Sequence, residues 1–372
     1  MEINNQRLID KFIDTVNHIS VSDKIAIFYD PDGDGMCASV LLQRALERLN
    51  KKVVLVSNEF HGSGAFTFEN RTMLQKKGVT HVFTLDLPVD HNLQNFEILS
   101  SFTTVILDHH PTRNVNHPRS ILLMKPAFFT NMKEPSYYCT SKLVYDLMLR
   151  LVNITDLKWL AISGLVADYC WKDWDTFLRE GFKEYGVVWK DYLYDTEFGM
   201  LTKLIAGAAA FFDNNASATE SRELLFASTN FGDALQKLAK FGTVNKCIDD
   251  YIDHFAERAE LYSREQLMIL EHKEPYNINS PIATGISTKK YPHKFILIVH
   301  DRGDVVKLST RSSSNSWNTD KILQECTRGF ENFSVGGHAA SSGGFIQKKD
   351  YPEFKKRIIA AIGNVRPAAP QV

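Results

Sequence analysis

The sequence predicts an α/β protein with a doubly wound parallel sheet domain, a helical connector and a smaller C-terminal α/β domain. Apolar runs of strand length alternate with amphipathic segments from residue 24 to residue 124. Mostly helical patterns follow from residue 140 to about residue 241, and strand patterns return after Glu274-Pro275. Alternating strands and helices along a chain are typical of a parallel sheet that carries helices on both faces.

Hydrophobic periodicity gives the expected elements. In the first domain we expect strands at 24–29, 53–57, 81–85, 104–107 and 121–124, with helices at 36–50, 69–77 and 92–99. Core helices are expected at 141–152, 157–168 and 201–212, and Ser217-Ala-Thr-Glu220 has the pattern of a capping box before another. A long amphipathic stretch at 246–272 predicts a connecting helix, followed by strands at 282–287, 295–300 and 305–311 and helices at 320–328 and 352–362.

These patterns predict three parts and a tail. The first part covers 1–240 and is helical in its later half, the connecting helix covers 241–275, and the C-terminal domain covers 276–364. The tail, 365–372, is rich in Pro and Ala, and we expect it to be frayed.

Composition excludes several classes of protein. The 43 basic and 44 acidic residues give a net charge of −1, so there is no global electrostatic footprint for nucleic acid. The five cysteines are odd in number and form no CxxC pair, which disfavours a disulfide framework or a zinc cluster and suits a reducing cytoplasm. We expect no signal peptide, because the N-terminus has no apolar run, and no membrane span, because the longest apolar stretch, 204–212, is too short.

Acidic and histidine residues follow three of the predicted strands. Asp30-Pro-Asp32-Gly-Asp34-Gly35 follows the first strand, Asp86 the third, and Asp108-His109-His110 the fourth. The carboxyl ends of parallel strands share one edge of a sheet, so these loops should face one crevice. Crowded carboxylates repel one another, and divalent cations relieve that repulsion. Mixed Asp and His ligands suit Mn, Mg, Fe or Zn, and their number suits two metals about 3.5–4 Å apart.

Each loop taken alone has other interpretations. Asp30–Gly35 is also compatible with a calcium loop or a polar turn, but an EF-hand requires a glutamate six residues after its glycine, which is absent. Either histidine alone is compatible with a structural role, and Asp86 alone with a turn. Three such loops at successive strand ends are difficult to explain as turns.

The same residues resemble the DHH family of phosphoesterases, in the group of RecJ-like exonucleases and nanoRNases with a C-terminal DHH-associated domain. Asp108-His109-His110 is similar to its signature, and Asp30-x-Asp32-x-Asp34-Gly35 resembles its first motif in the RecJ-type form. Further similar segments, in the family's order, are Asp86 in LDLP, Gly164-Leu-Val-Ala-Asp168, and Gly336-Gly337-His338-Ala-Ala-Ser-Ser-Gly343-Gly344. The resemblance spans roughly residues 20 to 360. Many members carry a histidine in the first motif, which leaves the role of Asp30 open.

The resemblance implies two Mn²⁺ ions, with Mg²⁺ or another divalent cation as alternatives. It implies that Asp30 and Asp32 hold one metal, Asp86 bridges, and Asp34, His109 and Asp168 complete the other. Asp108 would orient a ligand histidine. His110 would act near the scissile phosphate as an acid or an electrostatic stabiliser.

The resemblance also implies that the C-terminal domain contacts substrate. Arg311 and Ser312 stand where relatives carry a phosphate-recognition element, and an arginine can grip phosphate bidentately. Gly336 and Gly337 would form a tight loop whose N–H groups approach phosphate oxygens, and His338 would hydrogen-bond the phosphate. A solvent-facing strand with ordinary polar residues is the alternative for 307–313.

The leading hypothesis is a Mn-dependent exonuclease that hydrolyses single-stranded DNA, RNA or short oligonucleotides to mononucleotides. A phosphatase or phosphodiesterase acting on 3′-phosphoadenosine 5′-phosphate or cyclic dinucleotides is the first alternative, and a non-catalytic replication scaffold the second. The sequence leaves open a homodimer, a replication or repair partner, and the role of the aromatic segment 171–198. Trp317 has a ring able to stack on a base, but a packed tryptophan is favoured.

Overall fold

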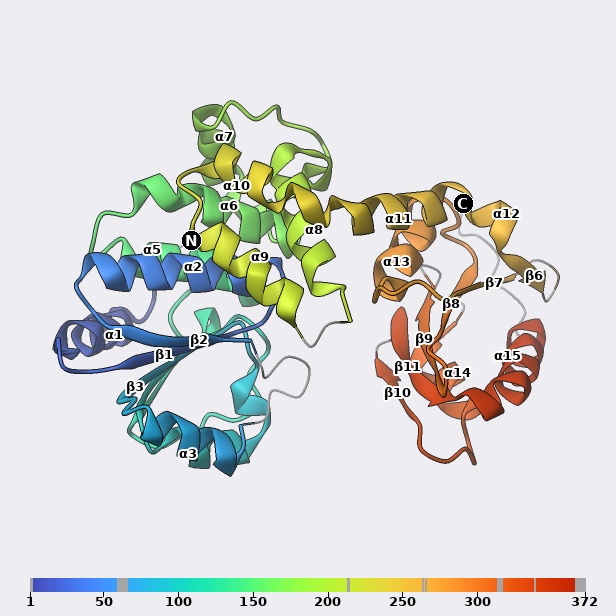
Figure 1. Ribbon diagram of the computed structural model, residues 1–372, viewed down its shortest axis with the longest axis horizontal. Helices are drawn as coiled ribbons and strands as arrows, with labels where there is room; N and C mark the ends of the chain where they lie inside the picture. The colour runs from blue at the N-terminus through green and yellow to red at the C-terminus, as the bar shows by residue number, and fades with distance from the viewer. Residues whose placement is uncertain are drawn as a thin grey trace. The chain divides into compact units, whose positions relative to one another are not determined.

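The computed structural model describes residues 3–58, 66–212, 215–262, 264, 266–312, 317–337 and 339–364 (Figure 1). The chain forms two compact units. Unit 1 consists of Met1–Ala209 and Asp213–Gly242, and unit 2 of Ala210–Phe212 and Thr243–Val372. The α/β class predicted from the sequence is confirmed in both units.

Unit 1 contains a parallel sheet of five strands in the order β2-β1-β3-β4-β5. The register aligns the strand ends, because Tyr29 pairs with Leu85, Leu85 with Leu107, and Leu107 with Met124. Four neighbouring strands, β1, β3, β4 and β5, therefore end at one level of the sheet. The strands are β1 Ile25–Tyr29, β2 Val53–Ser57, β3 His81–Leu85, β4 Thr103–Leu107 and β5 Ile121–Met124.

Helices cover both faces of this sheet, as a doubly wound fold requires. Figure 1 shows α2 (Gly33–Arg48) and α3 (Phe68–Lys76) on opposite sides of the strands. Leu74 of α3 and Phe96 of α4 (Leu93–Leu99) share a buried cluster with Phe28 of β1. The other described α-helices of unit 1 are α1 Gln6–His18, α5 Thr140–Met148, α6 Lys158–Ala167, α7 Asp175–Glu184, α8 Glu197–Ala209, α9 Ala216–Phe226 and α10 Phe231–Leu238.

Unit 2 contains a mixed sheet of six strands in the order β10-β11-β9-β8-β7-β6, in which only β7 and β8 are parallel. Trp317 is buried in its core with Phe295 and Phe354, so the packed interpretation of Trp317 is confirmed. The strands are β6 Glu260–Tyr262, β7 Leu267–His272, β8 Phe295–Asp301, β9 Val305–Arg311, β10 Ser334–Gly337 and β11 Ser341–Gln347. The α-helices are α11 Gly242–Asp253, α12 Phe255–Arg258, α13 Asn279–Lys289, α14 Thr319–Cys326 and α15 Tyr351–Asn364.

Two expectations for this half of the chain are wrong. The strand expected at 282–287 lies within helix α13, where Ile282, Ala283 and Ile286 form one buried face at helical spacing. The connecting helix expected at 246–272 ends at Asp253, and the chain continues through α12 into β6 and β7. β7 is buried on both faces, so its apolar run has no strand periodicity.

The capping box expected at Ser217–Glu220 is also wrong. Helix α9 begins at Ala216, and Asn215 precedes it in the left-handed conformation with φ 66°. Ser217 is therefore already inside the helix. Among the described helices, none combines the length and the apolar character that crossing a bilayer requires.

Phe28→Ala should destabilise unit 1 by about 3–5 kcal/mol, the usual cost of removing a buried phenylalanine. The ring is fully buried and makes an edge contact with Phe66 at a centroid distance of 5.2 Å. Urea unfolding followed by circular dichroism measures the change. Val21→Ala, at a side chain that is 80% exposed, should stay within about 0.5 kcal/mol of the parent.

Candidate metal centre

A row of charged residues follows the aligned strand ends of unit 1. Asp30, Asp86, Asp108 and Lys125 come directly after β1, β3, β4 and β5. The three aspartates extend the hydrogen bonding of the sheet by one residue. The amide of each donates to the carbonyl of the last residue of the neighbouring strand: Asp30 to Leu85, Asp86 to Leu107 and Asp108 to Met124. Asp86 then takes a positive φ of 60°, which turns the chain away from the strand direction.

The first turn of α2 places two more aspartates at this edge. Asp32 is the N-cap of the helix, and its carboxylate accepts a hydrogen bond from the Gly35 amide at 2.9 Å. Gly35 has no room for a side chain, because a Cβ there would lie 2.3 Å from the Asp30 carbonyl oxygen. The tight turn from Asp30 into α2 therefore requires glycine.

Asp34 is fully buried and held by the N-terminus of α5. Its carboxylate accepts hydrogen bonds from the amides of Thr140 at 2.6 Å and Ser141 at 2.9 Å. The positive end of a helix favours a carboxylate there. Gly164 of α6 packs against the same group, and a Cβ on it would lie 2.4 Å from Asp34 Oδ1.

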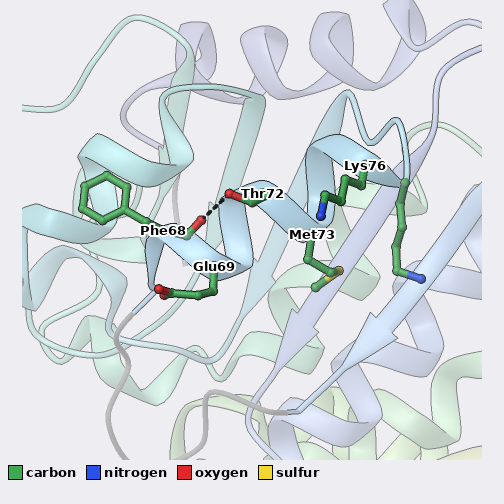
Figure 2. Close-up of a pocket in the computed structure, with 6 residues that line it drawn as sticks. Phe68, Glu69, Thr72, Met73 and Lys76 are labelled. Carbon is green, nitrogen blue, oxygen red and sulfur yellow. Dashed lines mark hydrogen bonds between the residues drawn. The ribbon is translucent and has the colours of Figure 1, made fainter.

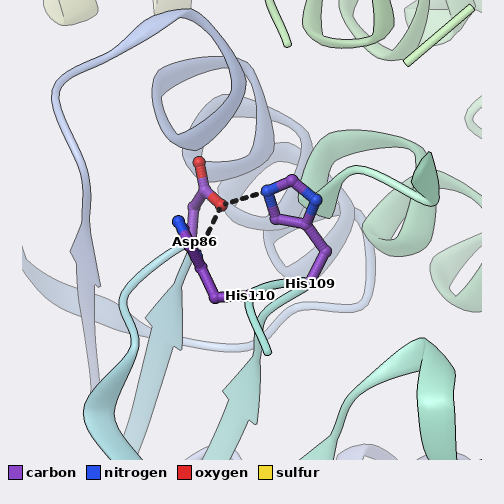
Figure 3. A group of neighbouring side chains, drawn as sticks. All are labelled: Asp86, His109 and His110. Carbon is purple, nitrogen blue, oxygen red and sulfur yellow. Dashed lines mark ion pairs between the residues drawn. The ribbon is translucent and has the colours of Figure 1, made fainter. Parts of the chain in front are cut away.

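Four side chains from separate segments meet at the centre of this edge. Ligand atoms of Asp34, Asp86, His109 and Asp168 all lie within 4.8 Å of one another. His109 Nε2 lies 3.3 Å from Asp86 Oδ1 and 3.0 Å from Asp168 Oδ2. Figure 3 shows the rings of His109 and His110 directed at the Asp86 carboxylate, with His110 Nδ1 3.9 Å from Asp86 Oδ1.

The other nitrogen of His109 is fixed by the backbone. Nδ1 donates to the Ser136 carbonyl oxygen at 2.5 Å, which leaves Nε2 as the nitrogen that faces the carboxylates. A ligand histidine usually has such a partner on its second nitrogen, because this sets the tautomer and the ring orientation.

His110 is oriented by Asp108, which is itself held by a buried lysine. Asp108 Oδ1 accepts from His110 Nδ1 at 2.7 Å, and Lys125 Nζ lies 2.7 Å from Asp108 Oδ2 and from Asp90 Oδ1. Lys125 is 1% exposed, and it also donates to the His110 carbonyl at 3.0 Å. The expectation that Asp108 orients a ligand histidine needs correction, since its partner is His110 and the Ser136 carbonyl orients His109.

The carboxylates divide into two electrostatic classes. Burial, then the charges of Asp86 and Asp168, raises the pKa of Asp34 to about 7, and burial likewise raises that of Asp86. Burial and the charges of Asp86 and Asp168 raise the pKa of Asp32 well above its usual range. Burial opposes the ionisation of Asp108 as well, but His110 and Lys125 outweigh it and lower its pKa to about 2.

This donor set fits divalent cations. Buried carboxylates that repel one another are stabilised in their ionised form by a positive charge between them. Burial opposes a charged His109 ring, but the hydrogen bonds to Asp168 and Asp86 outweigh it and raise its pKa, so the ring acts as the local counter-charge. A cation held by Asp34, Asp86, His109 and Asp168 would take over that role. Asp30 and Asp32 adjoin this quartet on the α2 side.

Cys170 also lies at this site and was not among the residues predicted from the sequence. Its sulfur forms a compact group with ligand atoms of His109 and Asp168. Burial and the charge of Asp168 raise the pKa of the thiol, which donates to the Asp168 carbonyl at 3.3 Å. A protonated thiol is a poor metal ligand, since metals bind the thiolate.

Lys125 and Asp90 belong to the charged network at this edge of the sheet and were not predicted from the sequence. The sequence did contain a signal for Lys125, because this residue directly follows a predicted strand, as Asp86 and Asp108 do. A lysine beside acidic motifs is usually a solvated surface charge, and only the aligned register shows that it lies among them.

The predicted phosphate-binding residues lie in unit 2. Arg311 donates to Ser280 Oγ at 2.6 Å, Thr284 Oγ1 at 3.1 Å and the Thr310 carbonyl at 2.9 Å. Ser312 follows β9 and is buried, with its amide donating to the Ala340 carbonyl. Gly336 and Gly337 were expected in a tight loop but pair with β11 as strand β10. The expected phosphate contact at His338 lies outside the described residues.

The chain also has a shallow hollow along α3, which is separate from this chemistry. Phe68, Glu69, Thr72, Met73, Lys76 and Lys77 line it (Figure 2). None of these residues belongs to the groups that can hold a metal among the described residues. The candidate centre is therefore identified from its donor atoms and not from cavity size.

Lys125→Met should destabilise unit 1 by about 3–5 kcal/mol, because it leaves Asp108 and Asp90 buried without their counter-charge. Both carboxylates are fully buried. Thermal and urea unfolding measure the loss. Lys172→Met, at an exposed lysine, is the matched control and should change stability by less than about 0.5 kcal/mol. A variant as stable as the parent would contradict the proposed role of Lys125.

Comparisons with known proteins give one family match and several solved structures of similar fold. Residues 24–168 match the model of the DHH family, N-terminal domain. No curated protein is similar in sequence. A solved exonuclease RecJ bound to manganese has a TM-score of 0.68 and 17% identity, over 100% of this chain and 98% of its own. RecJ from Thermus thermophilus in complex with Mn²⁺ has a TM-score of 0.62 and 16% identity, over 100% of this chain and 56% of its own.

A pGpG-specific phosphodiesterase from Vibrio cholerae has a TM-score of 0.50 and 15% identity, over 93% of this chain and 100% of its own. At such identities these likenesses establish the fold alone. The family match covers the segment that carries the first motif, Asp86, Asp108-His109-His110 and Asp168. Residues 24–168 are therefore similar to the N-terminal domain of the DHH family, and the fold of the chain is similar to that of RecJ.

Proposed function

We propose that the chain is a cytoplasmic Mn²⁺-dependent exonuclease that hydrolyses single-stranded nucleic acid or short oligonucleotides to mononucleotides. The observation that carries the proposal is the quartet Asp34, Asp86, His109 and Asp168 at the carboxyl edge of the sheet, with the Asp108–His110 pair beside it. Carboxylate and imidazole ligands beside a histidine acid suit phosphodiester hydrolysis.

Six residues are proposed to hold two cations: Asp30, Asp32, Asp34, Asp86, His109 and Asp168. When bound, the cations would neutralise negative charge on phosphate and lower the pKa of a water molecule. The fixed tautomer of His109 keeps Nε2 directed at the carboxylates. Two backbone amides hold the carboxylate of Asp34 in place, and neither carries a positive charge that would compete with a cation.

His110 is proposed as the proton donor to the leaving oxygen. The hydrogen bond to Asp108 raises its pKa and favours the charged ring near neutral pH. Its side chain is 40% exposed, and Nδ1 is engaged by Asp108, which leaves Nε2 as the nitrogen that could face a substrate. A positively charged imidazole can donate a proton to a leaving oxygen.

Unit 2 is proposed to bind phosphates of the substrate through Arg311, Ser312, Gly336, Gly337 and His338. The two hydroxyls and one carbonyl that bind the Arg311 guanidinium set its orientation. Gly337 has φ 151°, and a Cβ there would lie 2.5 Å from the Ser341 carbonyl oxygen, so glycine is required. The two glycines at the end of β10 leave its backbone open to the close approach of a ligand.

The likeness to a pGpG-specific phosphodiesterase supports a second candidate, a phosphodiesterase of dinucleotides. It differs from the first in substrate length. A product ladder from end-labelled RNA and DNA of two to twenty nucleotides, with Mn²⁺, separates the two. Stepwise release of mononucleotides from the longer strands supports the exonuclease. Cleavage of dinucleotides or cyclic dinucleotides alone would exclude it.

His109→Ala should lower the rate of hydrolysis by more than about a hundredfold, because it removes a metal ligand. His18→Ala is the matched control, since His18 is an exposed histidine in the last turn of α1. Initial rates on a labelled trinucleotide with Mn²⁺ provide the measurement. Unchanged turnover in His109→Ala would contradict the assignment of the site.

Mn²⁺ should stabilise the chain more at pH 8 than at pH 5. The pKa of Asp34, raised to about 7 without a cation, exceeds its ordinary value of 3.8. The folded chain thus retains a proton, and the stability gained from it is present below pH 4 and lost as pH rises through 7. Mn²⁺ must displace this proton at low pH.

Differential scanning fluorimetry with Mn²⁺ or with chelator measures this effect. A Mn²⁺ concentration a hundredfold above Kd should raise the free energy of unfolding by about 2.7 kcal/mol, which corresponds to an increase in Tm of about 5–10 °C. Asp34→Asn should reduce the shift, whereas Asp10→Asn, at an exposed aspartate of α1, should retain it. An equal shift at both pH values would argue against proton-coupled binding at Asp34.

A further inference from the structure

The aromatic residues in and around segment 171–198 separate into groups with different surroundings. Phe182 and Phe198 are buried and contact each other at a centroid distance of 5.0 Å, and Phe198 stacks on Phe231. This group packs α7 and α8 into the core. A second group, which we call the aromatic platform, gathers beyond the metal ligand Asp168. It consists of Tyr169, Trp171, Tyr192 and Tyr194.

The rings of the platform form a connected surface. Tyr169 and Tyr194 are nearly parallel, with 12° between their planes and 5.3 Å between centroids. Trp171 lies 5.1 Å from Tyr169, and Tyr192 donates its hydroxyl to that of Tyr169 at 3.1 Å. Tyr169 is 45% exposed and the other three rings are half-buried. The platform is therefore accessible to solvent, unlike the buried rings of Phe182 and Phe198.

The platform adjoins the candidate metal centre through the chain itself. Tyr169 directly follows Asp168, so their Cα atoms lie only about 3.8 Å apart. A second connection runs through α8, because Tyr194 forms a hydrogen bond with Thr202 of that helix. Thr202 and Ala167 both pack against Gly33, which directly follows the proposed metal ligand Asp32. The charge of Asp32 contributes to the raised pKa of Tyr194, after burial as the main cause.

The backbone of the platform is held in a conformation that a tyrosine rarely adopts. Tyr169 has φ 57°, in the left-handed region, where bulky residues are disfavoured and strain marks functional positions. Gly199 allows the turn Leu193–Asp195 to press on α8, because a Cβ there would lie 2.1 Å from the Tyr194 carbonyl oxygen. The sequence thus keeps a ring at position 169 where asparagine or glycine would fit the backbone better.

We propose that the aromatic platform binds a nucleobase of the substrate by stacking, with Tyr169 as its exposed ring, next to the phosphodiester that is cleaved. Aromatic side chains stack on any base, because every base has a π face. The platform would make the enzyme prefer nucleotide phosphodiesters to phosphodiesters that lack a base there. This inference rests on the proposed function, since it assigns the substrate class of the same site.

The test compares one trinucleotide with its analogues that carry an abasic sugar at each position in turn, with Mn²⁺ throughout. The parent chain should cleave the least favourable abasic analogue with a kcat/KM about 5- to 150-fold lower, the range expected from stacking on one base. Tyr169→Asn should abolish that discrimination while keeping or raising Tm, because asparagine tolerates the left-handed backbone. Tyr169→Phe, which keeps the ring, should retain the discrimination.

Tyr185→Leu is the matched control within the same segment. Tyr185 packs against Phe198 and Phe231, away from the platform, so its loss should leave the ratio between the two substrates unchanged even where stability falls. Equal cleavage of intact and abasic trinucleotides by the parent chain would overturn the inference and leave the proposed function standing. No cleavage of any of these substrates would instead refute the proposed function.

Discussion

Unit 1 is organised around the mutual repulsion of carboxylates that its own sheet brings together. A parallel sheet delivers every strand end to one edge, and here three of those ends are followed by aspartate. Water cannot screen Asp34, Asp86 and Asp108, because all three are buried. The fold compensates for this repulsion with different partners for different carboxylates.

Asp34 accepts hydrogen bonds from backbone amides, whereas Asp86 pairs with His109 and Asp108 forms an ion pair with Lys125. Each kind of partner sets a different charge state. Against the effect of burial, the hydrogen bond from His110 and the ion pair with Lys125 lower the pKa of Asp108 and favour its ionised form, which accepts the hydrogen bond that orients His110. Asp34 and Asp86 have only partial compensation, and their raised pKa values make them the places where an added cation has most to contribute.

The sequence predicted unit 1 well because its signals are local and regular. Short apolar runs separated by amphipathic helices define the strands, and Asp30, Asp86 and Asp108 were expected at one edge from the parallel topology alone. Lys125 and Cys170 escaped prediction, since their importance comes from register and packing and not from their neighbours in sequence. In unit 2, helix α13 was mistaken for a strand because a short apolar run, Ile282 to Ile286, fits either period. β7 was mistaken for part of a helix because a strand buried on both faces shows no alternation.

The ion pair between Lys125 and Asp108 has a consequence for how the enzyme would respond to metal supply. The pair is built entirely from the protein, so it persists whether or not cations are bound. His110 is thereby oriented by the protein alone, so under the proposed function chelation would stop hydrolysis without disordering the proposed proton donor. Activity should then return as fast as metal can enter, with no refolding step. Under the proposed function, the chain would respond reversibly to the supply of divalent ions, with its proposed proton donor already in position.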